Sequence, residues 1–363
     1  MKKKKIGIYI FFITFIYGLY QLFDNLSKVE SANPTSVYEK LAGKENINYL
    51  IIGDSIGRGS GATSKATAWF SRLEGHLKKE YGIKAKRHSL VQSGATAFEG
   101  FYKLQESKHL GKIDLTFIVF GENDHKYMDA KEFSYFYEGL IRKTKQLYPD
   151  TEMITITENP LDDEEFAKTI ASISTHYGAK NIDIRKPFKE TGLPAEDLTT
   201  DMVHPNDAGY EIYANTLLRK IKELVDRKAA IAVLSPPIQE DTDFEIAAIP
   251  HVKNRSGSFI HKDGLWESRT AGDSLEYEFE GPFLGVNMIR GEHGGKMDVF
   301  IDGTFITSLS AWWPLTKQRY QYIISGLENE SHHVNFIVSD KKSINNSSEE
   351  SVVQISSILT KAE

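Results

Sequence analysis

Cysteine is absent from this chain of 363 residues. Its absence excludes disulfide bonds, a thiolate nucleophile and cysteine-based zinc or iron–sulfur sites. Glycine-rich phosphate-binding loops are missing too, since neither Gly-x-x-x-x-Gly-Lys-Ser/Thr nor Gly-x-Gly-x-x-Gly follows the first expected strand. The 11 histidines are scattered and suggest no metal site. We therefore expect neither a metal nor a cofactor.

An excess of positive charge is also lacking. The 44 Lys and Arg are outnumbered by 50 Asp and Glu, which gives a net charge of −6. A general attraction to nucleic acid is therefore not expected. The length exceeds one ordinary core and suits two domains of ~150–200 residues.

Long apolar runs are rare, and the clearest lies at the N-terminus. Four lysines, Lys2 to Lys5, precede Ile6–Phe23, which contains no charged residue. As a helix this run spans ~27 Å, near the lower limit for crossing a membrane. A cleaved signal peptide begins in the same way. We favour an uncleaved anchor because the run exceeds a usual signal core and the candidate cleavage site at Ala32 has Glu30 at its −3 position.

The predicted topology follows from that anchor. Residues 1–23 comprise the cytoplasmic lysines and a single membrane helix, and residues 24–45 form a polar tether. Because lysines stay on the cytoplasmic side, the rest of the chain should lie outside the cell membrane. A cleaved and secreted protein is the alternative.

Strand and helix patterns alternate over residues 46–230. Expected strands are INYLIIG from residue 47, KAKRHSLV, DLTFIVFG, EMITITE and NIDI, and helices are expected at about 66–81, 97–108, 130–148, 162–177 and 206–227. This alternation predicts a doubly wound, flavodoxin-like parallel sheet between two helical layers. Residues 238–363 instead show short alternating runs separated by Gly and Asp-Gly turns, which predicts an antiparallel β-sandwich.

Four polar clusters fall where the expected strands end or in the last loop. They are Gly53-Asp54-Ser55, Ser93-Gly94, Gly121-Glu122-Asn123-Asp124 and the Asp201–His204 segment. Ligands of such sheets bind beyond the carboxyl ends of the strands. Each cluster alone could be a turn or a helix cap, but their order and placement together indicate a catalytic site. Ser55 could act as a nucleophile once His204 takes its proton, with Asp201 orienting the imidazole.

These clusters resemble the four motif blocks of the SGNH (GDSL-type) hydrolases over about residues 46–227. The resemblance implies a Ser55–His204–Asp201 triad. It also implies an oxyanion hole made by the Ser55 and Gly94 backbone N–H groups and the Asn123 side chain. Gly94 carries the weakest match, with Gly61 or Gly100 as alternatives. Asp54 and Asp124 are expected to be structural.

The second domain resembles the galactose-binding-like jelly roll that accompanies some carbohydrate O-acetyl esterases. Trp266, Trp312 and Trp313 could stack on sugar rings, or they could fill the sandwich core or the contact between the domains.

The function expected from these features is that of an extracytoplasmic serine esterase. Its expected partner is an acetylated carbohydrate polymer of the cell envelope or an exported polysaccharide. An O-acetyltransferase with the same triad and a non-catalytic polysaccharide-binding protein are alternatives, and thioester or lipid-ester hydrolysis is a further one.

Overall fold

The structure is a computed structural model that describes residues 35–362. The expected membrane helix, Ile6–Phe23, lies outside this range. Within the described part of the chain, no helix combines the length and apolar character needed to cross a membrane.

The first domain is built on five parallel strands in the order β2-β1-β3-β4-β5. The bounds are β1 Ile47–Gly53, β2 Ala85–Val91, β3 Leu115–Val119, β4 Glu152–Thr157 and β5 Lys180–Asp183. This is the flavodoxin-like strand order. The five strands were all predicted from the sequence, and the parallel α/β fold is confirmed.

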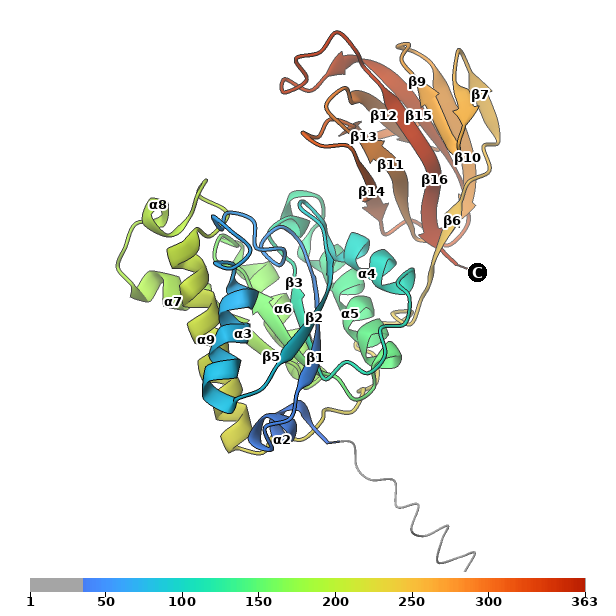
Figure 1. The fold of residues 1–363 in the computed structure, drawn as a ribbon. Coiled ribbons are helices and arrows are strands. Elements are labelled where there is room, and N and C mark those ends of the chain that lie inside the picture. The colour runs from blue at the N-terminus through green and yellow to red at the C-terminus, as the bar shows by residue number, and fades with distance from the viewer. Residues whose placement is uncertain (1–34, 363) are drawn as a thin grey trace, which may run out of the picture.

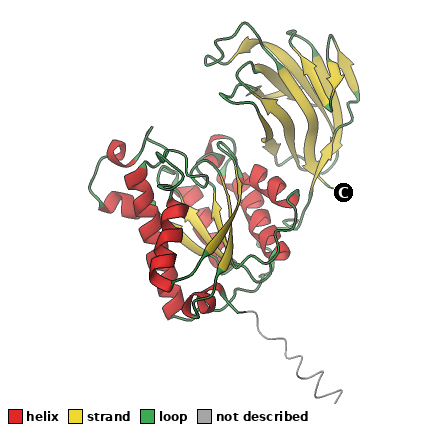
Figure 2. Ribbon diagram, in the orientation of Figure 1, coloured by secondary structure: helices red, strands yellow, loops and turns green. Residues whose placement is uncertain are grey.

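Helices cover both faces of this sheet and produce three layers (Figures 1 and 2). Side chains from α4 Ala97–Gln105, α5 Ala130–Leu147 and α6 Glu164–His176 share one apolar cluster with one face of the strands. Side chains from α2 Val37–Ala42, α3 Trp69–Tyr81 and α9 Asp207–Asp226 share a second cluster with the opposite face. Short helices α7 Arg185–Glu190 and α8 Ala195–Leu198, with the 3-10 turn η1 Asp124–Lys126, complete the domain.

Helix α2 lies within the segment that we expected to be a polar tether. Ser36 and Glu39 form a reciprocal capping box at its start. Val37, Tyr38 and Leu41 are buried in the cluster shared with α9. The packed domain therefore begins before residue 46, because three apolar side chains on one side of a short capped helix join the core.

The second domain consists of two antiparallel sheets that face each other. One has the order β13-β12-β15-β10-β7 and the other β14-β11-β16-β9-β8, with β6 paired to β16. The bounds are β6 Ile246–Ile249, β7 Asn254–Ser256, β8 Ile260–Lys262, β9 Leu265–Ser268, β10 Ser274–Glu280, β11 Phe283–Arg290, β12 Gly295–Ile301, β13 Thr304–Ser310, β14 Lys317–Ser325, β15 Ser331–Lys342 and β16 Val353–Lys361. Inward side chains of both sheets form a third apolar cluster, as expected for a β-sandwich.

The two domains meet through aromatic side chains between α4 and β14 (Figure 1). Tyr102 and Tyr320 lie edge to face with ring centroids 4.6 Å apart. Phe98 contacts Tyr322 in the same manner, with centroids 5.9 Å apart. The rings of Phe98 and Tyr322 are buried in the cluster that fills one face of the first domain. The apolar core is thus continuous across the domain contact, and this contact brings β14 beside the end of the sheet where the site residues gather.

Candidate active site

Ser55 stands on a tight turn directly after β1. Every residue from Tyr49 to Gly53 is buried, so the strand is fixed in the middle of the sheet. The Arg58 N–H donates to the Asp54 carbonyl, which folds residues 54–58 into one helical turn. The Asp54 side chain accepts hydrogen bonds from the Ile56 and Gly57 N–H groups at 2.8 and 3.3 Å. These bonds cap the turn, as we expected of a structural Asp54, and they hold Ser55 beyond the strand end.

Ser55, His204 and Asp201 lie in one hydrogen-bonded line. The Ser55 Oγ is 2.9 Å from the His204 Nε2. The His204 Nδ1 is 2.7 Å from the Asp201 Oδ2. In this arrangement His204 can take the hydroxyl proton while Asp201 fixes the tautomer and stabilises the imidazolium. The structure therefore brings together the three residues proposed as the triad.

The loop that carries Asp201 and His204 is stabilised by a hydrogen bond between its own backbone and side chain. Asp201 also accepts the His204 backbone N–H at 2.8 Å. Although partial burial acts in the opposite direction, these bonds from His204 lower the pKa of the Asp201 carboxyl. Asn206 caps α9 by accepting the Ala208 and Gly209 N–H groups.

Asn123 follows β3 and points toward the nucleophile turn. Its Nδ2 donates to the Asp54 Oδ2 at 2.7 Å, which leaves the second amide hydrogen for an oxyanion. Asp124 accepts the Ala97 and Gly121 N–H groups at 2.7 and 3.1 Å. Asp124 thus ties the Asn123 loop to the start of α4, a structural role of the kind we expected.

Three buried carboxyls lie beneath the site. Burial raises the pKa of Asp54 to about 6 and that of Asp124 to about 7. Burial, followed by the charge of Asp54, raises the pKa of Glu158 well above its usual range. Glu158 also accepts the Glu122 N–H at 3.0 Å. A proton on Glu158 lets Asp54 remain the charged partner of Asn123.

Gly94 has a left-handed backbone with φ of +76°, which favours glycine. The preceding residue, Ser93, contacts the nucleophile turn, because its Oγ accepts a hydrogen bond from the Arg58 Nη1 at 2.8 Å. The alternative glycines have packing roles. A Cβ on Gly61 would lie 2.4 Å from the Pro205 carbonyl oxygen, and one on Gly100 would lie 2.4 Å from the Phe120 ring. The oxyanion role of the Gly94 N–H stays a prediction.

The second domain reaches the Gly94 loop through two side chains. The Arg319 Nη2 donates to the Gly94 carbonyl at 2.8 Å. A Cβ on Gly94 would lie 3.4 Å from the Trp313 ring. Glu99 forms a buried ion pair with Arg319 at 2.8 Å. Among the tryptophans predicted to stack on sugar, Trp313 is therefore the one that lies beside Gly94.

Of the other two predicted tryptophans, Trp266 lies elsewhere and Trp312 directly precedes Trp313. Trp266 is on β9, stacked on His261 with ring centroids 4.6 Å apart, and it packs against the sandwich core. β9 is next to the far edge of its sheet, away from β14. Trp312 is half-buried, and its carbonyl accepts the Arg290 Nη2 at 2.9 Å. The structure does not bring Trp266 to the triad.

Sequence reasoning missed Arg58, Glu99, Glu158, Arg290, Lys317 and Arg319. No local motif marks Arg319, because it meets Glu99 only when residues 220 positions apart in the chain come together. Glu158 directly follows β4, and its place at that strand end was an available signal.

Comparisons with known proteins concern the family of the first domain and the fold of both domains. Residues 51–212 match the GDSL-like Lipase/Acylhydrolase family. A sequence search of curated proteins finds no significant match. Among solved structures, the chain is similar to a two-domain esterase active on acetylated mannans, with a TM-score of 0.69, 17% identity and coverage of 90% of this chain and 94% of the other. The same esterase co-crystallized with mannopentaose gives the same TM-score and coverage at 18% identity.

A catalytic mutant of an acetylxylan esterase from Geobacillus stearothermophilus is also similar, at 23% identity and a TM-score of 0.40, over 48% of this chain and 94% of that one. The similarity to the two-domain esterase shows a shared fold. The family match covers the region that holds Ser55, Asn123, Asp201 and His204. Residues 51–212 therefore belong to the GDSL-like lipase/acylhydrolase (SGNH) family, and the protein is an esterase of that family with a β-sandwich as its second domain.

Proposed function

We propose that this esterase removes O-acetyl groups from a polysaccharide. The observation that carries the proposal is the approach of the second domain to the Gly94 loop, where Arg319 bonds to the Gly94 carbonyl and Trp313 lies beside Gly94. A tryptophan ring at the edge of an ester-hydrolysing site can stack on a sugar ring. The similar two-domain esterase that is active on acetylated mannans supports this choice of substrate class.

The proposed reaction begins when the Ser55 hydroxyl attacks the acetyl carbonyl and His204 takes the proton. The negative charge that forms on the carbonyl oxygen would be stabilised by the Ser55 and Gly94 N–H groups and the free Asn123 amide hydrogen. His204 then protonates the sugar oxygen as its bond to the acetyl carbon breaks. In the second half of the reaction His204 takes a proton from water, the water attacks the acetyl group on Ser55, and acetate leaves as the Ser55 oxygen regains its proton. The role of the β-sandwich would be to bind the glycan, as in a galactose-binding-like jelly roll.

Acetate release from O-acetylated mannan by the full-length protein tests this function. Trp313→Ala should lower kcat/KM on the polymer relative to 4-nitrophenyl acetate, by about tenfold for the loss of one stacking partner. Trp266→Ala is the matched control, because Trp266 lies on β9 at the other side of the sheet. An equal loss on both esters in Trp313→Ala would assign Trp313 to packing instead.

An O-acetyltransferase remains the second candidate because the same triad can pass an acetyl group to a sugar hydroxyl. Product analysis with and without a non-acetylated acceptor glycan separates the two. A hydrolase releases free acetate in both cases, whereas a transferase forms an acetylated acceptor. The Ser55–His204 distance of 2.9 Å favours either enzyme over a non-catalytic binding protein.

We also propose that the N-terminal segment anchors the protein in the cell membrane with both domains outside. Lys2 to Lys5 and the uncharged run Ile6–Phe23 support this proposal. Protease added to intact cells should then degrade the catalytic domain, and fractionation should find the full-length chain in the membrane. A mature protein in the medium that starts after Ala32 would contradict the anchor.

A further inference from the structure

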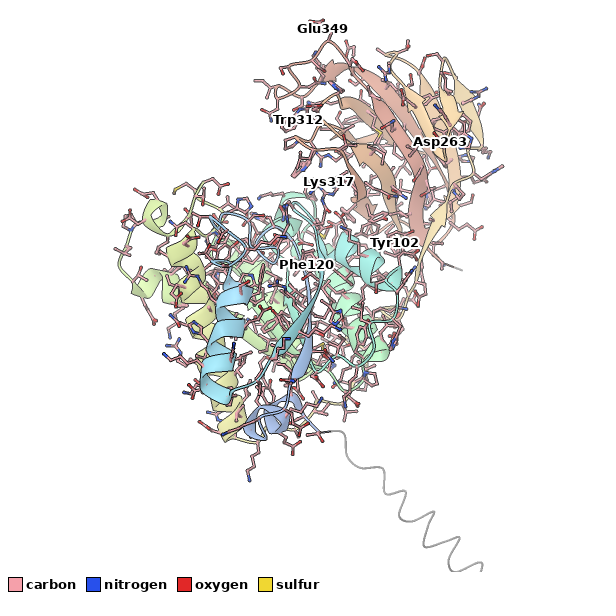
Figure 3. All side chains as sticks on the ribbon, viewed as in Figure 1. Tyr102, Phe120, Asp263, Trp312, Lys317 and Glu349 are labelled. Atoms are coloured by element: carbon pink, nitrogen blue, oxygen red, sulfur yellow. The ribbon has the colours of Figure 1, made fainter. Side chains whose placement is uncertain are left out.

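Positive side chains from both domains gather around the Gly94 loop. Arg58, three residues after Ser55, is exposed and donates to Ser93. Arg319 donates to the Gly94 carbonyl. Lys317 lies two residues before Arg319 on β14, so both side chains extend from the same face of that strand. Lys317 lies on the side of the second domain that is turned toward the first (Figure 3).

The pairing of β14 with β11 adds a fourth cation. Arg290 is the direct cross-strand partner of Lys317, and Arg319 pairs with Met288, two positions away from Arg290. Like charges placed directly opposite each other in an antiparallel pair destabilise the sheet. The arrangement of Arg290 and Lys317 thus works against the stability of the domain, which points to a role outside folding.

Carboxylates of the described residues form an ion pair with one of these four cations, Arg319. Within residues 35–362, neither Arg58, Lys317 nor Arg290 has a carboxylate within ion-pair distance. Arg319 is paired with Glu99, and Glu99 also contacts Lys103. The Arg290 Nε and the Arg319 Nη1 are buried with no hydrogen-bond partner among the described residues. Buried donors of charged groups normally have partners, so an external acceptor is expected here.

The pKa values of the group agree with an anion site. Burial, followed by the charge of Arg319, lowers the pKa of Arg290 to about 10. Burial, followed by the charges of Arg58 and Arg319, lowers the pKa of Lys317. The ring of Trp313 offers only a partial counterpart, with its centroid 5.0 Å from the Arg290 guanidinium carbon. A bound anion would relieve the mutual repulsion of these side chains.

We propose that the glycan acted on by this esterase is acidic, with a carboxylate or phosphate group that binds among Arg58, Arg290 and Lys317 while the neighbouring acetyl ester meets Ser55. The inference rests on the proposed deacetylase function and narrows its substrate class. Guanidinium groups suit this task because they bind carboxylate and phosphate oxygens with paired, charge-assisted hydrogen bonds. The anion stays bound through the reaction and takes no part in bond making or breaking.

Three chemically O-acetylated polymers test the proposal with the full-length protein: neutral mannan, polygalacturonate with carboxylates, and phosphomannan with phosphates. At about 20 mM NaCl, kcat/KM for at least one acidic polymer should exceed that for mannan by about tenfold. At about 500 mM NaCl the preference should largely disappear, because salt screens attraction between partly exposed charges. The acidic polymer with the higher kcat/KM identifies whether the site prefers carboxylate or phosphate.

Lys317→Glu is the direct variant and Lys262→Glu its matched control. Both substitutions change the charge of the second domain equally, but Lys262 ends β8, at the edge of the sheet opposite β14. Lys317→Glu should lower the ratio of acidic to neutral kcat/KM by about tenfold, while Lys262→Glu keeps the ratio of the unaltered protein. Thermal unfolding of both variants shows that they fold. Equal rates on acidic and neutral polymers, with no change of ratio in Lys317→Glu, would overturn the proposal.

A binding measurement separates this inference from the deacetylase proposal. In calorimetric titrations, the Ser55→Ala protein should bind non-acetylated polygalacturonate or phosphomannan about tenfold more tightly than mannan, and Lys317→Glu should remove the difference. Failure to release acetate from any ester would reject the proposed deacetylation, whereas equal binding of acidic and neutral glycans would reject the anion site.

Discussion

Arg319 of the β-sandwich and Glu99 of the catalytic domain form an ion pair 2.8 Å long in which each side chain is 1% exposed. The same guanidinium donates to the Gly94 carbonyl. Docking of the second domain is therefore coupled, through one side chain, to the loop that is expected to complete the oxyanion hole.

Removing one member of this pair should destabilise the protein strongly. Arg319→Met leaves the buried Glu99 carboxylate with Lys103 as its remaining ion-pair partner among the described residues, and breaking a buried pair costs about 3–5 kcal/mol. Arg319→Met combined with Glu99→Leu should recover part of that loss, because the buried carboxylate is then removed. Denaturant unfolding of the singles and the double measures the difference. A loss below about 1 kcal/mol in Arg319→Met would show that the pair is not structurally important.

Asn123→Ala should lower kcat by about 10²-fold or more with little change in KM. The reason is that the free amide hydrogen of Asn123 acts on negative charge that develops only in the transition state. Steady-state kinetics with 4-nitrophenyl acetate measure both constants. An effect confined to KM would make Asn123 a substrate-binding residue.

Asp201→Asn should lower kcat by about 10²–10⁴-fold, because an amide cannot stabilise the imidazolium and favours the wrong tautomer of His204. Asp207→Asn provides a matched comparison from the same stretch of chain. Asp207 accepts hydrogen bonds from Thr63 and has no contact with His204, so its loss should affect kcat far less. Similar losses in both variants would argue that Asp201 acts only through the shape of the loop.

Glu158→Gln should stabilise the protein more at high pH than at low pH. Burial raises the pKa of folded Glu158 well above 4.5, so the folded state binds this proton more tightly than the unfolded chain. That contribution to stability is complete below about pH 4.5 and is lost as pH rises through the folded pKa. Glutamine is neutral at every pH, so it needs no proton to be buried at this position.

The melting temperature of Glu158→Gln should therefore exceed that of the unaltered protein at about pH 8, and the gap should shrink toward about pH 5. Melting curves across this range test the sign. A gap that widens toward low pH would mean that Glu158 is charged in the folded protein.

Local patterns were sufficient for most of the fold. The five parallel strands were visible as apolar runs, and β10 to β15 as alternating runs. Strand β16, Val353–Lys361, was missed although it lies in the middle of its sheet, because its apolar alternation follows the polar segment 343–351. Helix α2 was missed for a similar reason, since three apolar side chains are too few to show a periodic pattern.

Some residues of the site could also be predicted from local patterns, and others could not. Ser55, Asn123, Asp201 and His204 belong to short motifs at strand ends or in the last loop, so the sequence displays them. Arg319, Glu99 and Lys317 depend on how one domain lies against the other, which no short stretch of sequence encodes. Trp313 was a candidate by residue type alone, and only its distance from Gly94 separates it from Trp266.

Covalent labelling of Ser55 is the most direct test of the triad. A fluorophosphonate reacts with a serine only when a neighbouring base activates its hydroxyl. Peptide mass spectrometry of the labelled full-length protein should find one adduct, on Ser55, and the adduct should be nearly lost in His204→Ala although the variant remains folded. A label on another serine, or equal labelling of Ser55 without His204, would contradict the nucleophilic role assigned to Ser55.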